Sequence, residues 1–169
     1  MTFIHILTHL ESVLLWGFAA TAVMTTVLYG SQGLGLSRLS LPFLVGTCVT
    51  GNRDWAILLG FILYTIGGWL FAFLYFMIFS QLGFATGWLG ATIGLAHGLF
   101  LLTVVLPVLP HIHPRMASEY DGPTAVRRLE PPGFLGLNYG YRTPLTTLLG
   151  HASYGAILGV GYSIAYISH

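Results

Sequence analysis

Apolar residues along this chain are not spread evenly but gather into four long blocks. The blocks cover residues 13–29, 55–79, 88–109 and 145–167. Each comes close to the roughly 20 residues that a helix needs to cross about 30 Å of hydrocarbon. The pattern predicts an all-α protein, an integral membrane four-helix bundle in which residues 1–169 form a single membrane domain.

Composition supports the membrane prediction. Charged residues make up 7% of the chain, against about 25% in a soluble domain, and the mean hydropathy is +0.79. Four spans would leave no room for a soluble catalytic module. The first block does not resemble a cleaved signal peptide, because residues 1–12 contain neither lysine nor arginine.

All of the formal positive side-chain charge is arginine, and it is distributed unevenly. The chain has no lysine, and its six arginines lie in two of the connecting segments, residues 30–54 and 110–144. The six predicted topology anchors are Arg38, Arg53, Arg115, Arg127, Arg128 and Arg142. Under the positive-inside rule these two segments are cytoplasmic loops. We therefore expect a multi-pass protein of the cytoplasmic (inner) membrane with both termini outside.

Each loop carries local structural signals. Residues 123–130 are expected to form two helical turns, with Val126 and Leu129 facing the membrane surface. Asn52 or Asp54 is expected to cap the second long helix.

Thr143 is expected to cap the last long helix, with Pro144 in its first turn. Tyr139 and Tyr141 are expected to form an aromatic belt at the interface.

Small residues recur at four-residue spacing within the apolar blocks. Because helices in lipid associate by close backbone approach, these positions predict packing faces. The glycines singled out are Gly90, Gly94 and Gly98 in the third block, and Gly155 and Gly159 in the fourth. We expect a tight bundle, or one that also associates as a homo-oligomer or with a membrane-protein partner.

A short internal similarity suggests a second description of the same fold. LLGFILYTIGG at residues 58–68 resembles LLGHASYGAILG at residues 148–159. The fold would then be two pseudo-repeated hairpins related by an axis along the membrane normal.

Two histidines lie inside the apolar blocks, where a polar side chain is a candidate functional residue. At about 100° per residue, His97 falls on the face of Gly90, and His151 shares a face with Gly155. Together with Tyr154 they form the intramembrane polar candidates. Two facing imidazoles could hydrogen-bond between helices, relay a proton or ligate a haem axially.

A second histidine pair follows the third block. His111 and His113, with Glu119 and Asp121 nearby in sequence, could hold a divalent metal such as zinc or copper. The pair lacks a second ligand cluster at a diagnostic spacing. We therefore expect no cofactor, with haem or a divalent metal as the alternative.

Several short motifs together resemble a known family. They are AATAVMTT at residues 19–26, GLGLSRLSLPFLVG at 33–46, HPRM at 113–116 and GHASYGAILG at 150–159. In these the chain is similar to a family of small four-span bacterial integral membrane proteins of uncharacterised function. The resemblance implies a multipass membrane fold and supplies no activity or catalytic residue.

The sequence favours a non-enzymatic accessory or assembly protein, or a self-associating bundle, with residues 111–142 as its cytoplasmic contact surface. We find no catalytic motif and expect no nucleic-acid partner; the lipid bilayer is the expected surrounding. Two alternatives remain open. One is a small transporter or proton-linked carrier that uses the intramembrane histidines, and the other is a haem- or metal-binding membrane protein.

Overall fold

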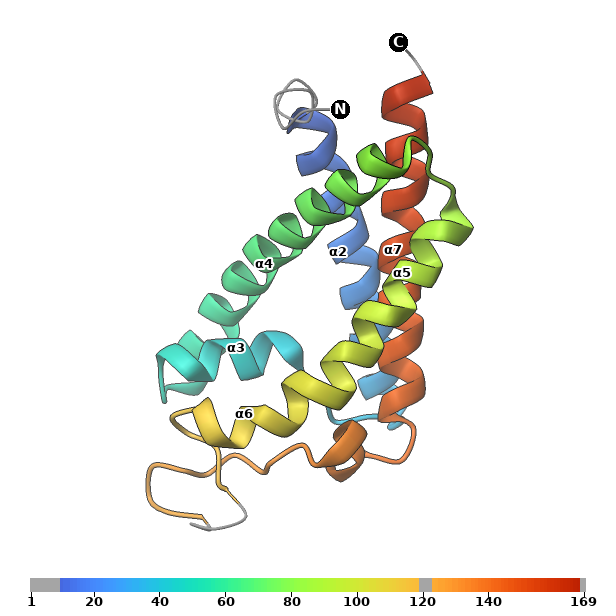
Figure 1. Cartoon of the computed structure of the whole chain (residues 1–169). Helices are drawn as coiled ribbons and strands as arrows, with labels where there is room; N and C mark the ends of the chain where they lie inside the picture. The colour runs from blue at the N-terminus through green and yellow to red at the C-terminus, as the bar shows by residue number, and fades with distance from the viewer. Residues whose placement is uncertain (1–9, 119–122, 168–169) are drawn as a thin grey trace. The chain divides into compact units, whose positions relative to one another are not determined.

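The computed structural model describes residues 10–118 and 123–167, and 78% of these residues are helical while none forms a strand (Figure 1). The all-α prediction is therefore confirmed for this part of the chain. In chain order the elements are α2 (Leu10–Gly33), α3 (Leu41–Val49), α4 (Arg53–Leu82), α5 (Gly87–Phe100), a π-helical stretch η1 (Leu101–Val105), α6 (Leu106–Ile112), a 3-10 stretch η2 (Phe134–Tyr139) and α7 (Thr143–Ile167).

The predicted apolar blocks all fall within long helical stretches. In the described residues, three stretches are long and apolar enough to cross a membrane: Leu10–Gly33, Arg53–Leu82 and Gly87–Ile112. Only 17% of the apolar window of α4 is buried, so most of its apolar side chains face outward. Exposed apolar surface on this scale does not suit a soluble monomer. These features indicate a membrane protein.

Helix α7 also has the length of a span, at 25 residues, but its composition is more polar. Its polar residues are mostly on the inside, since His151 and Thr147 are buried. Its large exposed side chains are apolar, namely Leu145, Leu149, Val160 and Ile164. The helix thus combines a polar inner face with an apolar outer face.

The third long stretch changes its hydrogen-bonding pattern at η1. Pro107 has no N–H to donate, and its ring would clash with the carbonyl four residues earlier, at Thr103, in a regular α-helix. The backbone widens there, so that the N–H of Leu106 donates to the carbonyl oxygen of Leu101, five residues back. Proline chemistry thus explains why α5 and α6 are separated by a π-helical turn.

The chain divides into two compact units. Unit 1 comprises residues 1–27, 65–98 and 148–169, and unit 2 comprises residues 28–64 and 99–147. The boundaries fall inside long helices, so that α2, α4 and α7 each contribute to both.

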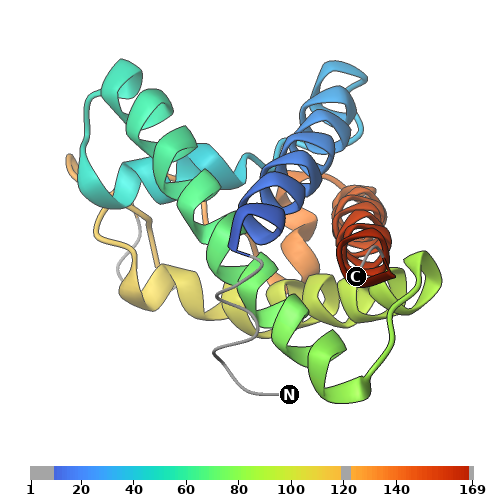
Figure 2. The same cartoon turned by 90° about the horizontal axis from the view of Figure 1, so that it is seen from above.

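In unit 1, α5 and α7 approach so closely that their backbones touch (Figures 1 and 2). A Cβ atom on Gly90 would collide with the carbonyl oxygen of Gly155, and one on Gly155 would collide with that of Gly90. Gly94 faces the carbonyl of His151 in the same way, and Gly159 faces that of Thr86. The predicted glycine faces therefore lie in one helix contact.

Helices α2 and α4 are also in close contact within unit 1. A Cβ on Gly17 would lie 2.8 Å from the Cβ of Ala72, and one on Gly68 would collide with the hydroxyl of Thr21. The indole N–H of Trp69 donates to the carbonyl oxygen of Leu14 at 3.0 Å. Small residues and one polar bond thus hold these two helices together.

In unit 2, the short helix α3 packs against the first half of α4 (Figure 2). Ser40 caps α3, its hydroxyl accepting the N–H of Phe43 at 3.4 Å. A side chain on Gly46 would collide with the backbone of Ala56, and one on Gly60 with that of Pro42. Residues 30–54 are thus largely helical and closely packed.

The two helical turns predicted for residues 123–130 do not form, so that prediction was wrong. The N–H of Leu129 donates to the carbonyl of Arg115 at 3.0 Å, and the N–H of Ala117 donates to the carbonyl of Leu129 at 2.9 Å. This bridge between Met116 and Leu129 uses backbone groups that a helix would need. Asp121, just before this segment, lies outside the described residues.

The caps agree only partly with expectation. Asn52 caps α4 as predicted, because its side-chain oxygen accepts the N–H groups of Asp54 and Trp55 at 3.0 and 3.1 Å. Thr143 is the first residue of α7, but its hydroxyl lies 2.8 Å from that of Ser37. Tyr139, expected at the membrane interface, is buried in unit 2.

Candidate functional site

His97 of α5 and His151 of α7 lie against each other in unit 1. Their ring centroids are 4.9 Å apart and their planes make an angle of 81°. His151 is buried and His97 is half-buried. Gly98 permits this, since a Cβ there would lie 3.0 Å from the Cβ of His151. The structure thus brings together the two intramembrane histidines that the sequence singled out.

Tyr75 of α4 joins this pair, although the sequence reasoning missed it. Its hydroxyl oxygen lies 3.4 Å from Nδ1 of His97, and the ring of Phe71 is stacked obliquely on His97 with centroids 4.2 Å apart. Tyr75 follows Gly68 by seven residues and Ala72 by three, which places it on the same helix face. That spacing was the signal that could have found it.

Tyr154, the third intramembrane polar candidate, lies beside Tyr75. Its hydroxyl donates to the backbone carbonyl of Gly68 at 2.6 Å, and its side chain is 1% exposed. Its ring meets that of Tyr75 edge-on with centroids 5.6 Å apart. Tyr154 therefore links α7 to α4, while Tyr75 makes the polar approach to His97.

The arrangement in unit 1 limits the chemistry of the histidine pair. Rings in edge contact leave no room for a haem macrocycle between them, which argues against axial ligation by this pair. A row of Tyr75, His97 and His151 can instead hydrogen-bond between helices or pass a proton. We call these three residues the intramembrane polar row.

His113, in unit 2, is a structural anchor between distant segments. Its Nδ1 accepts the backbone N–H of Arg115 at 3.1 Å, so the ring proton lies on Nε2. Nε2 lies 3.0 Å from the carbonyl oxygen of Leu44, to which it donates, and 3.2 Å from the hydroxyl of Thr47. The side chain is 3% exposed. It therefore fixes the chain after α6 onto α3.

His111 and His113, the predicted metal pair, lie in different surroundings. His111 is exposed on α6, whereas both ring nitrogens of His113 are engaged, so His113 offers no lone pair to a metal. Glu119 and Asp121, the nearby acids in that prediction, lie outside the described residues. Within the part of the chain described, no three His, Cys, Asp or Glu side chains are grouped to hold a metal ion.

Arg115 adds a second link to α3. Its Nη1 donates to the backbone carbonyls of Thr47 and Cys48 at 2.7 and 3.2 Å. These carbonyls belong to the last turn of α3 (Leu41–Val49), where the helix dipole is negative and a cation is favourable. Arg115, predicted from the sequence as a topology anchor, thus caps the C-terminal end of α3.

A third link in unit 2 joins Arg38, Glu130 and Tyr139. Arg38 Nη2 lies 3.2 Å from Glu130 Oε2 and also donates to the carbonyl of Asn138. The Tyr139 hydroxyl donates to the backbone carbonyl of Glu130 at 2.6 Å. The pKa of Tyr139 is raised to about 12, first by burial and then by the Glu130 carboxylate, while Arg38 acts in the opposite direction.

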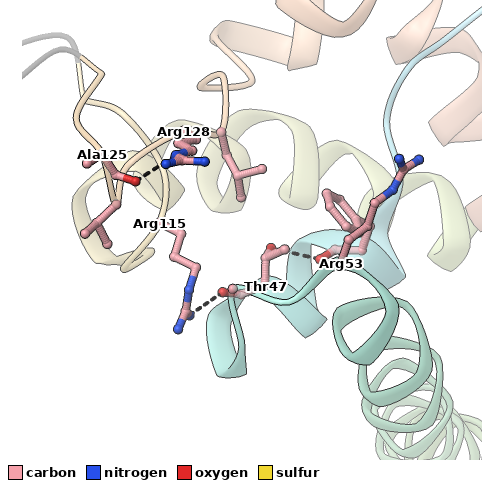
Figure 3. A pocket seen from close by; sticks show the side chains of 9 residues that line it. Thr47, Arg53, Arg115, Ala125 and Arg128 are labelled. Carbon is pink, nitrogen blue, oxygen red and sulfur yellow. Dashed lines mark hydrogen bonds between the residues drawn. The ribbon is translucent and has the colours of Figure 1, made fainter.

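A cavity of about 320 Å³ lies beside these links in unit 2 (Figure 3). We call it the arginine cavity, because three arginines line it. Its lining residues are Phe43, Thr47, Gly51, Arg53, Arg115, Ala125, Val126, Arg128 and Leu129. Arg53 comes from the first turn of α4, and the other two arginines come from the segment after α6. Sequence reasoning noted the arginines but had no means to place them around one cavity.

The remaining predicted anchors lie elsewhere. Arg142 stacks over the ring of Tyr141, with Cζ 5.1 Å from the ring centroid. Arg127 takes part in a turn, its backbone N–H donating to the hydroxyl of Thr124 at 3.0 Å. Neither lines the arginine cavity.

Comparisons of this chain with protein-family models, with curated proteins and with solved structures gave no match.

Proposed function

We propose that this chain is a multi-pass protein of the cytoplasmic membrane, with four spans and both termini outside. Three apolar helices of spanning length support this, as does the apolar outer face of the 25-residue α7. All six arginines lie in residues 30–54 and 110–144, which the positive-inside rule assigns to the cytosol. Membership of the four-span family that the chain resembles is part of this proposal.

Within that membrane setting, we propose a non-enzymatic accessory or assembly role, with residues 111–142 as the cytoplasmic contact surface. One observation carries this proposal: this segment is fixed in place yet exposes large apolar side chains. His113, Arg115 and Arg38 hold it by the links described above. Its exposed apolar side chains are Ile112, Val126, Phe134, Leu137 and Tyr141. A segment that served only as a topology anchor would need charge but no fixed apolar surface.

Site-specific photo-crosslinking in the native membrane tests this role. A crosslinker at Val126 or Phe134 should capture a discrete protein, either a second copy or another membrane protein. The matched position is Leu70 of α4, which is equally exposed and is expected to face lipid. Crosslinks to protein at Leu70 but none at Val126 or Phe134 would contradict the proposal. A reporter at the C-terminus that proved cytosolic would contradict the topology.

A second candidate function rests on the intramembrane polar row. A titratable pair inside a membrane helix bundle marks a possible proton or substrate path, and the contact between His97 and His151 supports this reading. The corresponding function is a small proton-linked carrier. Proton flux into proteoliposomes should then be lost in His97→Ala and in His151→Ala. Flux that is the same in these variants as in the wild type would remove the carrier role of the histidines.

A further inference from the structure

The positions of three arginines are not explained by topology. The positive-inside rule depends on how many arginines a segment carries, and it does not require them to meet. Arg53, Arg115 and Arg128 nevertheless line one cavity, although Arg53 is more than sixty residues from the others in sequence. A clustered positive charge of this kind needs a separate explanation.

These arginines retain most of their hydrogen-bonding capacity. Each guanidinium has five N–H donors. Arg115 uses Nη1 on α3, and Arg128 uses Nε on the carbonyl of Ala125 at 2.7 Å. The Arg53 side chain forms no hydrogen bond or ion pair with the described residues. In Figure 3, Arg53 comes from the start of α4, and Arg115 and Arg128 both come from the segment after α6.

The cavity has no negative charge among the described residues to balance these arginines. The acids in the described part of the chain are Glu11, Asp54 and Glu130, and none of them lines the arginine cavity. Glu130 is already paired with Arg38 at 3.2 Å. A concave surface lined by three guanidinium groups and by none of the described acids attracts anions. Arginine in particular matches the geometry of phosphate oxygens.

The rest of the lining is apolar. Phe43, Val126 and Leu129 form walls beside the charged groups. The volume of about 320 Å³ lies at the lower end of small-molecule sites, roughly 300–1,000 Å³. Gly51 keeps one wall open, because a Cβ there would lie 3.2 Å from Nε of Arg115. The cavity therefore suits an anionic group that carries a small organic part.

We propose that the arginine cavity binds a phosphate-bearing ligand, with the phosphate at Arg53, Arg115 and Arg128 and its organic part against the apolar walls. Either the headgroup of an anionic phospholipid or a free phosphate compound has this chemistry. The site goes beyond the accessory function proposed above. It requires only the fold of unit 2, so either proposal can fail without the other.

Two variants test the site without removing a structural contact of α3. Among the described residues, the exposed Arg53 side chain removed in Arg53→Gln makes no hydrogen bond, and the exposed Arg128 side chain removed in Arg128→Gln bonds to the carbonyl of Ala125. Arg142→Gln is the matched control. It removes one arginine charge from residues 110–144, but Arg142 does not line the arginine cavity. Circular dichroism in mild neutral detergent checks that all three variants fold. Arg115 is left intact because it caps α3.

Two measurements distinguish a free phosphate compound from a phospholipid headgroup as the ligand. In the first, the midpoint of thermal unfolding is measured in sodium phosphate and in sodium chloride of equal ionic strength. In the second, protein from phosphatidylglycerol or phosphatidylcholine nanodiscs is examined by native mass spectrometry for retained lipid. A higher unfolding midpoint in phosphate identifies a soluble ligand. Retained phosphatidylglycerol, with no change of the midpoint in phosphate, identifies a lipid headgroup.

In the measurement that responds, Arg53→Gln and Arg128→Gln should each weaken binding about tenfold, as expected for the loss of one charge-assisted contact, while Arg142→Gln should bind like the wild type. No response in either measurement would overturn the proposal. An equal loss in Arg142→Gln would also overturn it, because it would indicate general charge attraction without a site.

Discussion

Both units of this chain pack helices through glycines, including Gly46 and Gly60 in unit 2, and the units differ in how much of the remaining chain is held by side-chain bonds. In unit 1, helices touch through glycines, and Gly90 and Gly155 bring two backbones into direct contact. In unit 2, short segments are joined by side-chain bonds to backbone carbonyls, as His113 and Arg115 show. Lipid gives helices little hydrophobic drive to associate, so steric fit is the main source of attraction there. Connecting segments with irregular backbone must instead satisfy carbonyls and N–H groups one by one.

The largest effect should come from filling the glycine contact of unit 1. In Gly90→Ala, the added Cβ would meet the carbonyl of Gly155, which cannot move without separating α5 from α7. We expect the free energy of unfolding to fall by about 3 kcal/mol, the upper end of usual overpacking costs. Titration with SDS followed by circular dichroism measures this change.

Gly67→Ala is the control for that experiment. Gly67 lies in α4, and a Cβ there would meet nothing within 4 Å. Because alanine favours helix more than glycine by about 1 kcal/mol, this variant should be as stable as the wild type or more so. Equal destabilisation by both substitutions would show that backbone contact is not what holds unit 1.

The next effect should come from removing the anchor of unit 2. His113→Ala leaves the N–H of Arg115 without its partner and removes one donor from the carbonyl of Leu44, which still accepts from the Thr47 hydroxyl. A buried polar group that loses its partner costs about 1–3 kcal/mol. Trypsin should then cleave after Arg115 and Arg128 about tenfold faster, since about 1.4 kcal/mol, within that range, corresponds to a factor of ten.

His111→Ala is the matched control, because His111 is exposed on the neighbouring helical turn. Its cleavage rate should equal that of the wild type. If His113→Ala also leaves the cleavage rate unchanged, His113 does not fix the connecting segment. The inference that side-chain bonds to backbone groups hold unit 2 would then be wrong.

The same contrast explains what the sequence could predict. Apolar blocks report directly on long helices, and the cap at Asn52 depends on residues two or three positions away. Residues 123–130 were misread because Leu129 bonds to Arg115 and Ala117, a pairing that no local pattern encodes. His113 was kept as an alternative metal ligand because its partners in the fold, Leu44 and Thr47, are 69 and 66 residues away.

The candidate sites follow the same rule. His97 and His151 could be assigned to helix faces by periodicity, which is why their approach was foreseeable. Tyr75 obeys the same periodicity and could have been included. The arginine cavity is different, since it arises from three segments folded together in unit 2, and periodicity within one helix carries no information about that.

Alkaline pH should weaken unit 2 through Tyr139. The pKa of this phenol is raised to about 12, chiefly by burial, from an ordinary value of 10.0. The neutral phenol is thus favoured by folding, so its contribution is fully present below pH 10 and is lost as pH rises toward 12. Tyr139→Phe should be less stable than the wild type by about 1 kcal/mol at pH 8, the usual value of one hydrogen bond.

The difference between the two proteins should then shrink between pH 10 and 12, because only the wild type can ionise this group. Chemical unfolding at a series of pH values measures it, and the other tyrosines are common to both proteins. A difference that stays constant up to pH 12 would mean that Tyr139 is not held by burial and by its bond to the carbonyl of Glu130.

The smallest effects should come from two phenols inside unit 1, and they distinguish packing from function. Tyr154→Phe loses a bond of 2.6 Å to the carbonyl of Gly68, whereas Tyr75→Phe loses only the 3.4 Å approach to His97. Bonds between membrane helices average about 0.6 kcal/mol, so Tyr154→Phe should cost about that much and Tyr75→Phe less. If the intramembrane polar row carries protons, Tyr75→Phe should nevertheless reduce flux in proteoliposomes more than Tyr154→Phe does. If Tyr154→Phe, the less stable variant, instead loses more flux than Tyr75→Phe, both tyrosines act in helix packing and the intramembrane polar row does not carry protons.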